Sequence, residues 1–232
     1  MKTSKLFLTY AAGLFAAFSA QAQGTFQNLN FEAANLTPIP PNQGAVQVPI
    51  TSALPAWTGY IGTDQITQVY QNTYGEGLAQ IDIFGPNYPS AGPTFGPIPG
   101  TIDGNYSVLL QSDAIAGASI AQTGTIPPGS QFVEFKAWQT ASTQFTVSFD
   151  GTSLTPVVFG SGTNYTLYGA DVSPYAGQSG QLEFTADFSG TGASWLGLDD
   201  ITFSTTPEPG TLALVVMGGL AFAVRRWRGR GS

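Results

Sequence analysis

The side chains that could do chemistry in this chain are carboxylates, because the sequence has 14 Asp and Glu residues but no His and no Cys. This composition excludes Ser-His and Cys-His nucleophilic pairs, thiolate nucleophiles and zinc sites built from the usual ligands. Paired carboxylates can hydrolyse glycosidic bonds. However, no pair is marked by local sequence, and Lys136 is the only basic residue between residues 24 and 206 that could orient one. We therefore expect that the protein is not an enzyme. The alternative is a metal- or carboxylate-dependent enzyme that acts on glycans.

The charges are distributed unevenly along the chain. The segment between residues 24 and 206 holds thirteen of the fourteen acids against Lys136 alone, a formal charge of −12. Nucleic-acid binding requires clustered Lys and Arg to neutralise phosphates, so it is excluded as a function. Cations and neutral polymers are the ligands that such a segment favours.

Aromatic rings are the second group of side chains that could bind a ligand, because flat rings suit the apolar faces of sugars. Trp57 and Tyr60 are flanked by Pro55 and Gly59, which predicts a platform on a loop. Trp138 and Trp195 occur beside strand patterns, and we expect them to pack in the core or on a sheet. Packing is the alternative for the loop pair as well.

The elements that must position these groups are strands. Apolar residues alternate with polar ones in several short runs, which is the pattern of a strand buried on one face. Asp150-Gly151 predicts a tight hairpin, because both residues accept a positive φ. We expect one antiparallel β-sandwich (jelly roll), an all-β domain over residues 23–206. The alternating runs are Val46, Val48 and Ile50; Phe145, Val147 and Phe149; and Leu182, Phe184 and Ala186.

The N-terminus has the layout of a secretory signal peptide. Lys2 and Lys5 precede an apolar run that ends at Phe18, and Ala20-Gln21-Ala22 follows as a small-residue cleavage pattern. We expect residues 1–22 to be a signal peptide that is removed after Ala22. A retained N-terminal helix is the alternative.

The C-terminus has the layout of a short membrane anchor. Residues 211–224 carry no charge and would form a helix of roughly 21 Å, against a hydrocarbon core of roughly 30 Å. The flanking side chains must therefore extend the span, and the basic tail 225–232 is expected to stay in the cytoplasm. A buried core helix is the alternative. The membrane-flanking residues are Arg225, Arg226, Trp227 and Arg228.

Pro207-Glu208-Pro209 stands directly before this helix, in the exposed spacer 207–210. The order of Pro-Glu-Pro, short apolar helix and terminal Arg cluster, behind a signal peptide, closely resembles the bacterial PEP-CTERM sorting signal. The resemblance implies processing by an exosortase, a membrane protease that cuts at the motif. It also implies export through the inner membrane, a membrane-anchored precursor, and a mature form at the cell surface or outside the cell.

Two further segments resemble the galactose-binding-like and carbohydrate-binding jelly rolls. Residues 28–32 read Asn-Leu-Asn-Phe-Glu, and residues 198–203 read Leu-Asp-Asp-Ile-Thr-Phe. In that group the first and last strands are neighbours, and acids near them hold a structural Ca²⁺. The resemblance thus implies a metal site of Glu32 with Asp199 or Asp200. The alternative is that the two Asp residues end a strand and bind loop amides.

These expectations combine into one function. The sequence predicts an exported surface or matrix protein whose jelly roll binds an envelope polysaccharide. A structural matrix protein that binds no ligand is the first alternative.

Overall fold

The computed structural model describes residues 25–40, 46–73, 77–86, 88, 100–139, 143–188 and 193–205. The predicted signal peptide, the Pro-Glu-Pro motif, the helix 211–224 and the basic tail lie outside these residues. No helix in the described ranges is long and apolar enough to span a membrane.

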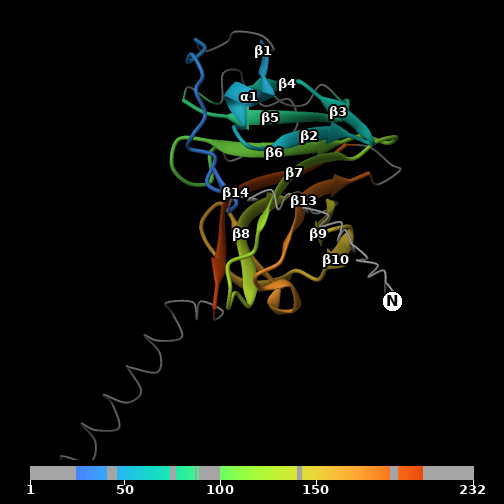
Figure 1. Ribbon diagram of the computed structural model, residues 1–232. Helices are drawn as coiled ribbons and strands as arrows, with labels where there is room; N and C mark the ends of the chain where they lie inside the picture. The colour runs from blue at the N-terminus through green and yellow to red at the C-terminus, as the bar shows by residue number, and fades with distance from the viewer. Residues whose placement is uncertain are drawn as a thin grey trace, which may run out of the picture.

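The described chain is a sandwich of two β-sheets (Figure 1), which confirms the expected fold class. The larger sheet has eight strands in the order β1-β4-β5-β6-β14-β8-β12-β11, and all neighbours are antiparallel except β4 and β5. Its strands are β1 (Val46–Pro49), β4 (Gln68–Gln71), β5 (Gln80–Phe84), β6 (Ser107–Ser112), β14 (Ser194–Ser204), β8 (Phe132–Gln139), β12 (Thr166–Asp171) and β11 (Val157–Ser161).

The smaller sheet has six strands in the order β10-β9-β13-β7-β2-β3. Only two short helices accompany the sheets in the described residues, α1 (Ile50–Ala53) and the 3₁₀ turn η1 (Ser173–Tyr175). The expected strand through Ile50 ends at Pro49, and Ile50 begins α1. The strands of this sheet are β10 (Thr152–Leu154), β9 (Gln144–Phe149), β13 (Ser179–Asp187), β7 (Ala118–Thr125), β2 (Thr58–Ile61) and β3 (Asp64–Ile66).

The core lies between the sheets and follows from the alternation in the sequence. Leu182, Phe184 and Ala186 of β13 are fully buried, as their period-two spacing predicts. The Phe184 ring meets the Phe135 ring of β8 edge-on, with centroids 5.1 Å apart. The predicted hairpin is also confirmed, because Asp150 (φ 46°) and the glycine after it join β9 to β10 with positive φ.

The N-terminal segment differs from the expected first strand. Apart from one isolated bridge at Thr25, residues 25–40 form no strand, and the chain turns at residues 29–33, with Asn28 and Phe31 at positive φ. The segment still lies beside the last strand, since the Ile201 amide of β14 donates to the Leu29 carbonyl at 2.9 Å. The expected neighbours therefore meet as a turn and a strand.

A β-bulge interrupts the pairing of β14 with β8. Asp199 pairs with Lys136, but the next pair is Thr202 with Glu134, so two residues of β14 face one residue of β8. Asp200 takes a positive φ of 48° at this point. Such a bulge bends the strand and re-aims its side chains.

Candidate functional site

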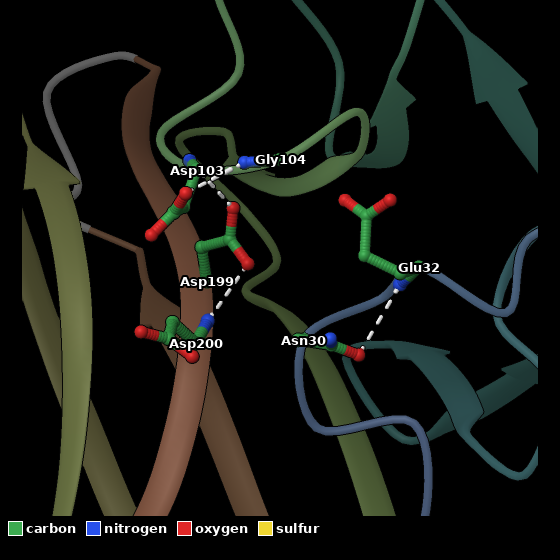
Figure 2. A pocket seen from close by; sticks show the side chains of 6 residues that line it. All are labelled: Asn30, Glu32, Asp103, Gly104, Asp199 and Asp200. Atoms are coloured by element: carbon green, nitrogen blue, oxygen red, sulfur yellow. Dashed lines mark hydrogen bonds between the residues drawn. The ribbon is translucent and has the colours of Figure 1, made fainter.

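Six residues around this bulge line a pocket of about 180 Å³, which we refer to as the acidic pocket. They come from the N-terminal turn, the loop before β6, and β14 (Figure 2). The structure thus brings the three predicted metal ligands to one place and adds a fourth acid that the sequence did not mark. The lining residues are Asn30, Glu32, Asp103, Gly104, Asp199 and Asp200.

Asp199 is the buried carboxylate of this pocket, with 1% of the residue exposed. Its Oδ2 accepts hydrogen bonds from Ser107 Oγ at 2.5 Å and from the Asp103 amide at 3.0 Å, and its Oδ1 accepts one from the Asp200 amide at 2.7 Å. Burial raises the pKa of Asp199 to about 7, because desolvation of the charged form outweighs these three hydrogen bonds.

Glu32 holds the loop before β6 from the opposite side. Its Oε1 accepts from the amides of Asn105 (2.6 Å) and Tyr106 (2.9 Å), and its Oε2 accepts from Asn105 Nδ2 (3.0 Å). Gly104 is required at this point, because a Cβ there would collide with the Glu32 carboxylate and its φ is +56°. Both oxygens of Glu32 are therefore engaged by the loop.

Lys136 supplies the positive charge at this site. Its Nζ lies 2.5 Å from Asp103 Oδ2 and 2.8 Å from Asp200 Oδ2, and its side chain is 17% exposed. Burial acts to lower the pKa of Lys136, but the hydrogen bonds and charges of the two carboxylates outweigh it and raise that pKa. The same contact, first through its hydrogen bond, holds the pKa of Asp103 below its usual value.

The oxygens present do not fit a Ca²⁺ shell in this arrangement. Ca²⁺ takes six to eight oxygens, yet Glu32 and Asp199 accept protein hydrogen bonds with both oxygens, and Asp200 is paired with Lys136. Figure 2 shows the Asp200 carboxylate pointing away from Glu32. Within the described ranges, no group of three or more His, Cys, Asp or Glu side chains is arranged to hold a metal.

Lys136 bears on whether these acids need a metal. Glu32, Asp199 and Asp200 line one pocket, and like charges close together repel unless a cation compensates them. The register of β8 against β14 places Lys136 opposite Asp199, so the compensating cation is a side chain. Ca²⁺ binding by these acids stays a prediction from the sequence.

The predicted aromatic platform is wrong for Trp57. This ring is 4% exposed and packs against Phe31 and Phe184, with centroids 5.8 and 6.4 Å away. Its Nε1 donates to the Asn28 carbonyl at 3.0 Å, so its polar atom is satisfied inside the protein. Tyr60 is half-buried on β2 in the smaller sheet. The two rings therefore do not offer a shared face to a ligand.

A different pair of rings lines an open groove of about 410 Å³ beside the larger sheet. Trp138 of β8 and Tyr165, just before β12, lie one residue beyond the Ala137–Thr166 pair. We refer to this site as the aromatic groove. The sequence did not indicate it, because the two rings become neighbours only through the register of β8 with β12. The lining residues are Ala137, Trp138, Gln139, Ser161, Gly162, Thr163, Asn164, Tyr165 and Thr166.

The aromatic groove is connected to the acidic pocket. Lys136 Nζ lies 5.2 Å from the centre of the Tyr165 ring, within cation–π range. Asn164 Nδ2 donates to the carbonyls of Thr101 (3.2 Å) and Ile102 (3.4 Å), in the loop that also carries Asp103. The hairpin that forms one wall of the groove is thus fixed to the loop that Lys136 holds.

Residues 205–228 match the PEP-CTERM protein-sorting motif. This confirms the resemblance drawn from Pro207-Glu208-Pro209. The PEP-CTERM motif indicates export, with a membrane-anchored C-terminal sorting signal and a cell-surface or extracellular fate. The match covers the end of the chain and does not assign the sandwich to a family.

Solved structures resemble the sandwich at low identity. The carbohydrate-binding module TmCBM61, solved with β-1,4-galactotriose, is 13% identical, with a TM-score of 0.38 over 78% of this chain and 98% of that one. The enzymatically active domain of tailspike protein 4 from bacteriophage CBA120 is 17% identical, with a TM-score of 0.37 over 65% of this chain and 19% of that one. None of the curated proteins matches the sequence.

The PEP-CTERM motif begins where the sandwich ends. β14 runs to Ser204, and the match starts at residue 205. β14 is hydrogen-bonded on both sides, to β6 and β8. The strand that leads into the sorting signal is therefore central in its sheet and carries Asp199 and Asp200 of the acidic pocket.

Proposed function

We propose that this chain is an exosortase-sorted surface or matrix protein whose sandwich binds a neutral envelope polysaccharide in the aromatic groove. The PEP-CTERM motif supports the surface fate. The observation that carries the ligand class is the pair of rings, Trp138 and Tyr165, in a groove of about 410 Å³. Ligand pockets typically measure about 300–1,000 Å³, so the groove has room for a sugar residue.

The chemistry of the lining favours sugars. Apart from the two rings, the residues that line the groove carry hydroxyls, amides or no polar side-chain group, and none of them is charged. Aromatic faces pack on the C–H faces of sugars, while hydroxyls and amides bind their hydroxyls.

Charge selects against acidic polysaccharides. Lys136 is the only cation between residues 24 and 206, and it is already paired with two carboxylates. A uronate or sulfate chain would therefore meet no free positive charge on a sandwich of high negative charge. Neutral polymers meet no such repulsion.

Affinity gel electrophoresis of the full chain in mild detergent tests this proposal. The gels contain soluble neutral polysaccharides with glucose, galactose or mannose backbones, or polygalacturonate as the acidic comparison. We expect at least one neutral polymer to retard the protein, and Trp138→Ala to weaken that retardation about tenfold or more. A tenfold weakening corresponds to a loss of about 1.4 kcal/mol of binding free energy from one stacked ring.

Tyr60→Ala is the matched control, because it removes a half-buried ring from the other sheet. We expect this variant to bind like the unmutated protein. Retardation that is lost with Tyr60→Ala and kept with Trp138→Ala would contradict the assignment of the groove. If no polymer retards the protein, a purely structural matrix role is the better account. Release of reducing ends from a retained polymer would identify the enzyme alternative.

A further inference from the structure

We infer that the acidic pocket is an internal cation site which the chain fills with its own ammonium group, Lys136 Nζ, in place of a metal ion. The ammonium bridges Asp103 of the loop before β6 and Asp200 of β14, at 2.5 and 2.8 Å. A single charge thereby joins the loop to the last strand. The resemblance noted above implies Ca²⁺ for this corner of the fold, and the contacts of Lys136 supply another cation there.

The bulge in β14 is what makes this bridge possible. Side chains alternate along a strand, and the Leu198 and Asp199 side chains face opposite sides of the sheet. Regular alternation would point Asp200 toward the core with Leu198. The bulge, with Asp200 at φ 48°, turns its carboxylate to the side where Lys136 lies opposite Asp199.

The loop that carries Asp103 is held at both ends by carboxylates. Asp199 accepts a hydrogen bond from the Asp103 amide. Glu32 accepts hydrogen bonds from the amides of Asn105 and Tyr106, at the other end of the loop. Four carboxylates from three segments thus converge on one short loop. Lys136 is the only positive charge available between residues 24 and 206 to offset their mutual repulsion.

The side chain of Lys136 is shielded enough for this charge to matter. With 17% of the side chain exposed, the ammonium is screened less by solvent and salt than a surface group. Removing one member of a shielded ion pair destabilises the fold, because it leaves the charge of the remaining partner uncompensated. In this pocket, removal of Lys136 leaves Asp103 and Asp200 beside Asp199 with no cation.

Thermal melting of the full chain in mild detergent, followed by circular dichroism, tests the inference. The unmutated protein should melt at the same temperature in excess Ca²⁺ and in EDTA. Lys136→Met should lower the melting temperature by roughly 5 °C or more in EDTA. In this variant Ca²⁺ should restore part of the loss, because the freed carboxylate oxygens line a pocket of about 180 Å³.

Two further variants separate the bridge from general damage. Asp103→Asn should lower the melting temperature less than Lys136→Met, because the Asp103 side chain is 58% exposed. Added to Lys136→Met, it should not lower the melting temperature further, because the bridge is already lost in that variant. Asp171→Asn removes an exposed carboxylate at the end of β12 as the matched control, and its effect should add to that of Lys136→Met.

Three results would overturn the inference. The first is an unmutated protein that melts higher in Ca²⁺ than in EDTA, which would show that a metal is needed. The second is a Lys136→Met variant that melts like the unmutated protein. The third is additivity of Lys136→Met with Asp103→Asn. If Lys136→Met does not fold, Asp103→Asn in Ca²⁺ and in EDTA decides the same question, and Ca²⁺ independence with reduced melting supports the bridge.

Discussion

The Asp199 carboxylate of β14 accepts a hydrogen bond of 2.5 Å from Ser107 Oγ of β6, in a position where only 1% of Asp199 is exposed. Burial raises the pKa of this carboxyl group to about 7 in the folded protein. In the unfolded chain an Asp titrates near 3.9. Between about pH 4 and pH 7, the folded state therefore binds a proton at Asp199 more tightly than the unfolded state does.

This difference predicts that stability falls as the pH rises from about 4 to about 7. Below pH 4 both states are protonated at Asp199, and above pH 7 both are ionised, so the loss is confined to the window between the two pKa values. We expect the melting temperature, measured by circular dichroism in steps from pH 4.5 to 7.5, to decrease by several degrees, using about 2–4 °C per kcal/mol.

Asp199→Asn should flatten this profile, because it removes the titrating group. Asp103 and Asp171 do not mask the effect, since both have a lowered pKa and their contributions change mainly below pH 4. A melting temperature of the unmutated protein that rises between pH 4.5 and 7.5 would contradict the assignment of Asp199 as the titrating group.

The core between the sheets gives a second prediction. Phe184 is fully buried and contacts two other buried rings, Phe135 of β8 in the opposite sheet and Trp57 directly before β2. Phe184→Ala should lower the free energy of unfolding by about 3–5 kcal/mol, because it leaves a cavity at the centre of the sandwich. Denaturant unfolding measures this change. Phe188→Ala is the control, since that ring is 57% exposed and its loss should cost little.

The strands were predictable from the sequence because their signal is local. The alternation of Leu182, Phe184 and Ala186 requires only that one face of a strand is buried, and the burial confirms it. The Asp150-Gly151 hairpin is equally local, since its two residues tolerate positive φ. The sorting motif is a contiguous segment as well. These features depend on neighbours in sequence, so a pattern reveals them.

The site was predictable only in part, because it depends on pairing between distant segments. The resemblance brought Glu32, Asp199 and Asp200 together, and the structure places them around one pocket. The approach of Lys136 depends on the β8–β14 register and on a bulge at a non-glycine residue, which no sequence pattern marked. The prediction that Trp57 forms a platform was wrong because its flanking Pro and Gly indicate a loop without showing which way the ring points.

Glu32 provides a prediction with a local readout. Because its carboxylate accepts from the amides of Asn105 and Tyr106, Glu32→Gln should weaken these charge-assisted hydrogen bonds. We expect amide hydrogen exchange at residues 105 and 106 to accelerate, with a loss of global stability of about 1–2 kcal/mol. Glu183→Gln on β13 is the matched control and should leave exchange in this loop unchanged. Unaltered exchange in Glu32→Gln would contradict the prediction and show that the loop keeps its conformation without Glu32.

The last prediction concerns the chain beyond β14, where the PEP-CTERM motif matches residues 205–228. If an exosortase-type protease processes this signal, the mature surface or extracellular protein should lack the residues beyond Pro207-Glu208-Pro209, and mass spectrometry of that form measures its C-terminus. Neutral replacements of Arg225, Arg226, Arg228 and Arg230 should weaken retention of the precursor before processing, because the positive-inside effect that holds the helix end in the cytoplasm is lost. Fractionation of membranes and medium measures that change, and intact Arg230 in the final extracellular form would contradict processing at the motif.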